Sequence, residues 1–148
     1  MNERAEKIMG FLQKDLHLTK AQAAGVLGNF FQENDQLNPH KPGDNGNAVG
    51  IAQWNGPRKR ELASFAKSTG GDMHSLDTQL QFLKHELTHN ESGALHALQR
   101  THTPEEAARV FQAKFERAGN PMTSNRVKYA RMAYNHYGEG DGTALASN

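Results

Sequence analysis

Apolar residues recur every three or four positions along most of the chain, as is typical of amphipathic helices. Alternation of apolar and polar residues, the mark of a strand, is nearly absent, and only residues 47–54 suit a small β-hairpin. The pattern therefore predicts a mainly α fold with at most that hairpin. Helices are expected over residues 2–16, 20–33, 58–68, 76–88 and 124–137, with a short one starting at 90 or 92 and another starting after 103.

Local start and stop signals agree with this pattern. Thr19 and Gln22 have the spacing of a capping box, and the sequence Thr103-Pro104-Glu105-Glu106 combines a capping box with proline at the first helical position. The pair Gly70-Gly71 is expected to end a helix. Residues 38–47 contain Pro, Gly, Asp and Asn in the order that turns require, which predicts a loop.

The chain of 148 residues is long enough to bury one core without disulfide bonds. Since it shows neither an internal repeat nor a second domain, we expect a single domain over residues 1–137 and a monomer. Residues 138–148 are glycine-rich and polar, which predicts a flexible tail.

Charge and cysteine content exclude several classes of function. Without cysteine the chain can form no disulfide, thiolate nucleophile or cysteine-ligated zinc site. The net charge of +1 is too small to favour nucleic acid as a partner. Charged residues interrupt the start of the chain, where a signal peptide needs an apolar run, and no stretch approaches the length of a membrane span. We therefore expect no signal peptide, no membrane insertion and no nucleic acid.

The most informative stretch is 25–54, which carries Glu33 to the end of an apolar helix. A carboxyl group beside Phe30 and Phe31 would be partly removed from water, which favours the protonated form that a general acid needs near neutral pH. The alternative is a solvated acid at a helix end, without a catalytic role.

This stretch also carries a resemblance to a known family. The order Glu33, then Leu37-Asn38-Pro39, then 48–54 with Gln53 placed 20 residues after Glu33, resembles the phage tail lysozyme family. That family belongs to the lysozyme-like superfamily, with goose-type lysozymes and lytic transglycosylases. Asn34 stands where the family usually has serine, and the segment from Glu33 to Asn38 is one residue longer than expected. Further matching segments are 79–83, 86–87, 92–95, 107–108 with Phe111, 115–119, and Arg126 with Ala130.

The resemblance implies a single-domain lysozyme-like helical fold and a muramidase. Such an enzyme would cleave the β-1,4 bond between N-acetylmuramic acid and N-acetylglucosamine in bacterial peptidoglycan, with Glu33 as general acid and without a cofactor. It would act on the cell wall as a bacteriolytic, antimicrobial glycosidase of bacteriophage origin, either virion-associated or released from the host cytoplasm.

The sequence leaves the identity of the second catalytic group undecided. An inverting hydrolase needs a base that activates water and a retaining one needs a nucleophile; Asp44, on the loop, is the preferred candidate. If instead the 6-hydroxyl group of the substrate attacks, as in lytic transglycosylases, the product is a 1,6-anhydro sugar and no second carboxylate is needed. A wall-binding module that has lost catalysis is a further alternative.

Five residues are candidates for substrate binding. Gln53 and Trp54 would present an amide and an indole to the sugar, although Trp54 could equally be core. Glu116 could form part of the groove wall or, with Arg117, an ion-paired surface turn. Tyr134 lies in an Ala-Tyr-Asn segment similar to one that lines the site of lytic transglycosylases. The five candidates are Gln53, Trp54, Asn55, Glu116 and Tyr134.

A competing motif occurs at 85–89, where His85, Glu86 and His89 fit the H-E-x-x-H pattern of zinc metallopeptidases. Lys84 and Glu91 flank the motif, whereas a zinc helix is usually apolar near its ligands. We therefore expect an exposed helix face without metal, and keep the metallopeptidase as the less favoured alternative.

Overall fold

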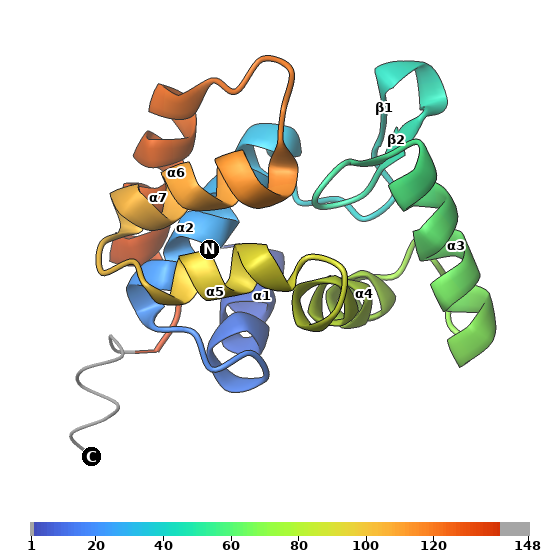
Figure 1. Cartoon of the computed structure of the whole chain (residues 1–148), viewed down its shortest axis with the longest axis horizontal. Coiled ribbons are helices and arrows are strands. Elements are labelled where there is room, and N and C mark those ends of the chain that lie inside the picture. The colour runs from blue at the N-terminus through green and yellow to red at the C-terminus, as the bar shows by residue number, and fades with distance from the viewer. Residues whose placement is uncertain (1, 140–148) are drawn as a thin grey trace.

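The computed structural model describes residues 2–139, and over that range the chain is mainly helical, as predicted (Figure 1). No described helix is long and apolar enough to cross a membrane. The α-helices are α1 (Glu3–Lys14), α2 (Lys20–Glu33), α3 (Pro57–Thr69), α4 (Leu76–Thr88), α5 (Ser92–Gln99), α6 (Pro104–Phe111) and α7 (Thr123–His136). The short elements are β1 (Pro42–Gly43), the 3₁₀ turn η1 (Asp44–Gly46), β2 (Ala48–Val49), β3 (Trp54–Asn55) and the π-helix η2 (Gln112–Glu116).

The predicted hairpin exists and carries one strand more than expected. Strand β2 pairs antiparallel with β3, and β1 pairs antiparallel with β2 on its other side. Sequence reasoning assigned Pro42 and Gly43 to a loop because both residues favour turns; they pair with Val49 and Ala48 at the edge of the sheet, where proline is tolerated.

Helix α2 lies at the centre of the helical part, with α6 and α7 packed against it (Figure 1). It can be buried this closely because two of its glycines let neighbouring backbones approach. A Cβ atom on Gly25 would lie 2.3 Å from the Cβ of Ala107, and one on Gly28 would lie 2.6 Å from the backbone nitrogen of Ala130. This packing fixes the direction in which the end of α2 points.

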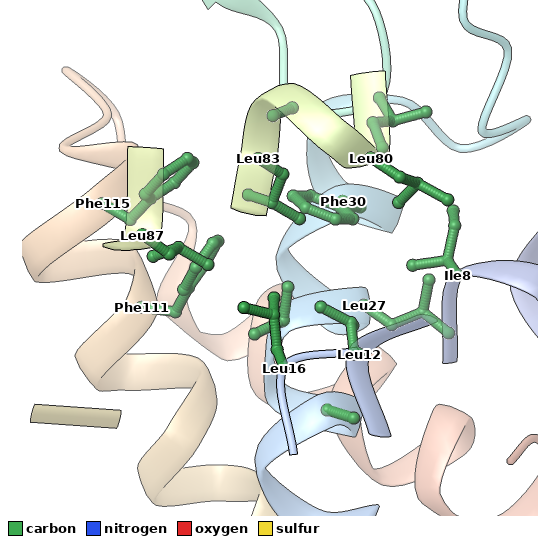
Figure 2. Packing of buried hydrophobic residues seen from close by; sticks show 14 of the residues in the cluster. Ile8, Leu12, Leu16, Leu27, Phe30, Leu80, Leu83, Leu87, Phe111 and Phe115 are labelled. Carbon is green, nitrogen blue, oxygen red and sulfur yellow. The ribbon is translucent and has the colours of Figure 1, made fainter. Parts of the chain in front are cut away.

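The apolar faces of several helices meet in one core. In Figure 2, Leu27 and Phe30 of α2 lie among side chains of α1 and α4 and near Phe111 and Phe115. The capping box at Thr19 is confirmed, since Gln22 N donates to Thr19 Oγ1 at 3.1 Å and Thr19 N donates to Gln22 Oε1 at 3.0 Å. The core and this cap hold both ends of α2 in place.

The first two residues of the expected tail contact helix α1. Gly138 and Glu139, assigned to the flexible tail, donate backbone hydrogen bonds to Glu6 and Gln13 of α1 at 3.1 Å each. The remaining tail residues, 140–148, lie outside the described residues.

Candidate active site

Glu33 is the last residue of α2, as predicted, and its side chain is 19% exposed. One carboxylate oxygen, Oε2, accepts a hydrogen bond of 2.7 Å from Nη2 of Arg126 in the first turn of α7. Among the described residues, none donates a hydrogen bond to the other oxygen, Oε1. Phe30 and Phe31, the expected neighbours, lie in the core, and the partner of the carboxyl group is a cation that sequence reasoning did not place there.

The side chain of Arg126 is buried and held by further hydrogen bonds. It is 2% exposed, Nη1 donates to Oδ1 of Asn29 at 2.9 Å, and Nε donates to the carbonyl of Pro121. Asn29, in turn, donates to the carbonyls of Gly25 and Ala108 at 2.9 and 3.0 Å. A buried guanidinium whose three nitrogens all donate hydrogen bonds is held rigidly, so it fixes Oε2 of Glu33.

The segment after Glu33 is tied to the sheet by Asn34, which is buried. Its Nδ2 atom donates to the carbonyls of Asn38 and Gly50 at 2.7 and 3.1 Å, and its Oδ1 atom accepts from Asn38 N at 3.1 Å. The resemblance described above led us to expect serine at this position. An asparagine can serve both carbonyls at once, which a hydroxyl group with a single proton cannot.

Gln53 lies in the same neighbourhood, although its amide nitrogen is occupied by backbone. Nε2 donates to the carbonyl of Lys41 at 3.0 Å and to that of Gly50 at 2.9 Å. Lys41 also reaches the carbonyl of Glu33 through Nζ at 3.4 Å. Gln53 therefore braces the backbone that lies beside the end of α2.

Asp44 and Asn55 lie together on the exposed surface of the sheet region. Asn55 Nδ2 donates to Asp44 Oδ2 at 2.9 Å, and Asp44 adopts a positive φ of 48° at the start of η1. Neither side chain has a hydrogen bond to Glu33 among the described residues. The structure thus pairs two predicted site residues with each other.

Two predicted binding residues lie away from the surface around Glu33. Trp54 is 1% exposed and donates from Nε1 to Glu86 at 2.7 Å, so it is a core residue and offers no ring face to a sugar. The ring of Tyr134 lies 4.8 Å from Nζ of Lys20, which begins α2, whereas Glu33 ends it. At 1.5 Å per residue those two ends are about 20 Å apart.

Glu116 was expected either in the groove wall or in an ion-paired surface turn with Arg117. It ends the π-helix η2, and its Oε2 atom is sealed from solvent without a hydrogen-bond partner among the described residues. Burial raises the pKa of the Glu116 carboxyl well above its ordinary value, and the negative charge of Glu33 acts in the same direction. Arg117, the expected ion-pair partner, instead pairs with Glu91 at 2.7 Å.

Within the H-E-x-x-H motif, Glu86 forms a structural ion pair with Arg58 of α3. Glu86 accepts from Trp54 Nε1 and from Arg58, whose Nε lies 3.1 Å away, and its side chain is 5% exposed. His85 and His89 lie on the exposed face of α4, as expected, with their rings stacked 4.4 Å apart. A glutamate bonded in this way does not face a metal between the two histidines. Within residues 2–139, no cluster of three or more metal-ligating side chains occurs.

The residues that sequence reasoning missed are the two arginines. Arg126 belonged to the matching segments but received no role, and Arg58 was considered only as part of a helix. The available signal was an arginine among apolar helix positions at 126, which implies a buried carboxylate partner.

A helical scaffold that presents one partly exposed carboxyl group, held by a buried arginine, is an arrangement suited to acid catalysis on a sugar bond. Comparison with protein families then identifies the chain: the model of the phage tail lysozyme family matches residues 3–137, so the chain belongs to that family. It is accordingly a lysozyme-like enzyme that acts on the peptidoglycan of the cell wall.

Proposed function

We propose that this protein is a muramidase that cleaves the β-1,4 bond between N-acetylmuramic acid and N-acetylglucosamine, with Glu33 as general acid. The observation that carries the proposal is the environment of the Glu33 carboxyl group. One oxygen is bound to the buried Arg126, while the side chain remains 19% exposed. Membership in the phage tail lysozyme family supports this role and a bacteriophage origin.

The two oxygens of Glu33 have different tasks in this mechanism. A proton on Oε1 passes to the oxygen of the leaving sugar as the glycosidic bond breaks, and the carboxylate that remains is stabilised by the guanidinium bound to Oε2. Because Arg126 is already fixed by Asn29 and Pro121, no reorganisation is needed when this charge appears.

The test of this role is Glu33→Gln, which keeps the shape of the side chain and removes the transferable proton. We expect lysis of purified peptidoglycan to fall by about 10² to 10⁴-fold with unchanged thermal unfolding. Glu105→Gln is the matched control, because Glu105 also pairs with an arginine of α7, Arg131 at 2.6 Å, but lies with Tyr134 at the other end of that helix. Near-full activity of Glu33→Gln would refute the assignment.

For the second group we propose Asp44 as the base that activates water, giving hydrolysis. Asp44 is an exposed carboxylate on η1, and its hydrogen bond from Asn55 orients it. The test combines Asp44→Asn with mass spectrometry of the products. A severe loss of activity and reducing sugar products support hydrolysis, whereas a mild effect with 1,6-anhydro products means that the 6-hydroxyl group of the substrate attacks instead.

A further inference from the structure

Gln79, in the first turn of α4, is fully buried and has no role in the proposed mechanism. Its amide nitrogen Nε2 donates to the carbonyl of Pro39 at 2.8 Å and to that of Met73 at 2.9 Å. Its oxygen Oε1 accepts from the backbone N–H of Ile51 at 3.1 Å. The amide therefore bonds only to backbone groups and joins α4 to three separate segments of the chain.

Two of these segments, 38–39 and 50–51, are also bound by Asn34. Asn34 donates to the carbonyl of the first residue in each segment, and Gln79 bonds to the second residue of each. Asn34 directly follows Glu33 and caps the end of α2, whereas Gln79 belongs to α4. The two segments are thus fastened to both helices by one amide side chain from each.

Gly50 permits the close contact with Gln79. Its φ of 87° lies in the region that residues with a side chain rarely adopt. A Cβ atom at this position would lie 2.6 Å from Oε1 of Gln79, which is closer than real Cβ atoms approach. The turn at Gly50 is therefore built directly against the amide of Gln79.

The same two segments flank the hairpin that carries Asp44. Residues 38–41 lead into β1, residues 50–53 follow β2, and Asp44 begins η1 between these strands (Figure 1). Fastening both ends of the hairpin to α2 and α4 fixes its position relative to the end of α2. An inverting hydrolase needs its acid and base about 6.5 to 9.5 Å apart, and a misplacement of about 1 Å can cost about 10²-fold in rate.

We propose that Gln79 is a positioning residue for the cleavage reaction. It holds the segment after Glu33 and the hairpin that carries Asp44 in the arrangement that the transition state needs. Being fully buried, Gln79 does not contact the sugar and acts through the backbone of Pro39 and Ile51. The inference rests on the proposed role of Glu33. Because Gln79 aligns groups and does not bind substrate, its loss lowers kcat and leaves KM nearly unchanged.

Gln22 is a matched control for this role. Its Nε2 atom donates to two backbone carbonyls at 3.0 and 3.2 Å, and its Oε1 atom accepts from the backbone N–H of Thr19 at 3.0 Å. Gln22 is also buried, but it lies in the first turn of α2, whereas Glu33 ends that helix. Loss of its amide should destabilise the fold as loss of Gln79 does, without moving the site.

The experiment measures kcat and KM of Gln79→Met and Gln22→Met on soluble peptidoglycan fragments, at a temperature where both variants are folded. Methionine has a similar shape but no amide. We expect the midpoint of thermal unfolding to fall in both variants. The kcat of Gln79→Met should fall about 10- to 100-fold with little change in KM, whereas that of Gln22→Met should stay near the parent value. Equal kcat values in the two variants, or a change confined to KM, would overturn the proposal.

If Gln79→Met does not fold, the same comparison is made with Gln79→Asn and Gln22→Asn. Asparagine keeps an amide on a side chain one methylene shorter, which cannot reach all three backbone partners, so kcat should again fall only at position 79. A parent-like kcat in Gln79→Asn would then overturn the proposal. Failure of the proposed function would look different, because Glu33→Gln would remain active; if only the role of Gln79 is wrong, Glu33→Gln is still inactive.

Discussion

Two of the glutamate–arginine pairs among the described residues look alike in sequence and differ in their surroundings. Glu86 of α4 and Arg58 of α3 form one, and Glu33 of α2 and Arg126 of α7 form the other. In the first pair both carboxylate oxygens are used, because Trp54 and Arg58 donate to Oε1 and Arg58 also donates to Oε2. In the second, Arg126 binds only Oε2.

This difference separates a structural acid from a reactive one. A buried carboxylate with every oxygen bonded can give or take a proton only by breaking its contacts, so it serves to hold elements together. A partly exposed carboxyl group with one oxygen fixed, and no hydrogen bond to the other among the described residues, is oriented and still able to react.

The largest effect should come from breaking the structural pair. Glu86→Ala leaves the half-buried Arg58 and the buried indole N–H of Trp54 without their partner, and loss of one member of a buried pair costs about 3 to 5 kcal/mol of unfolding free energy. Chemical denaturation measures this, with the exposed Glu61→Ala as control. The folded fraction should still cleave peptidoglycan. If Glu86→Ala kept normal stability but lost activity, Glu86 would be the reactive acid and the Glu33–Arg126 pair the structural one.

The second prediction tests the brace beside the reactive pair. Gln53→Ala removes two hydrogen bonds to the carbonyls of Lys41 and Gly50, worth about 0.5 to 1.5 kcal/mol each. We expect a stability loss of about 1 to 3 kcal/mol and a modest loss of activity, far below that of Glu33→Gln, because the backbone near Glu33 is misplaced while the acid remains. Parent-like stability and cleavage would show that this turn does not support the site.

The third prediction concerns stability against pH. Because burial raises the pKa of Glu116, the folded protein keeps a proton that the unfolded chain loses near pH 4.5. Stability should therefore decline by about 1.4 kcal/mol per pH unit above that value, until the folded carboxyl ionises as well. Glu116→Gln should lack this contribution, which thermal unfolding of both proteins across pH measures. Equal slopes in parent and variant would mean that Glu116 is not held protonated.

The helices could be predicted because their signals are local. The capping box at Thr19 and the leucine spacing of 76–88 placed α2 and α4 with the observed starts, and the position of Glu33 followed from them. Strand β1 was missed because two residues, Pro42 and Gly43, carry no alternation. The π-helix at 112–116 was missed because its apolar spacing continues that of α6.

The environment of the acid could not be predicted because it depends on long-range contacts. Arg126 lies 93 positions after Glu33, and Trp54 lies 32 positions before the Glu86 that accepts its hydrogen bond. An indole next to Gln53 suits a sugar platform and a core equally well until its partner is known. The place of Tyr134 beside Lys20 could not be predicted, because a three-residue segment carries no information about which end of α2 it approaches.

The smallest effect should come from the histidines beside Glu86. His85 is exposed, its ring stacks on that of His89 at 4.4 Å, and it lies tilted 5.4 Å from the ring of Phe65. His85→Ala should therefore change the unfolding free energy by no more than about 0.5 kcal/mol and leave cleavage intact. Activity measured with EDTA should likewise equal that without it, because Glu86 is bonded to Trp54 and Arg58 in the structural pair. If EDTA abolished activity and zinc restored it, Glu86 would have to leave Arg58 to serve a metal. The distinction between a structural and a reactive pair would then be wrong, and the metallopeptidase alternative would replace the muramidase.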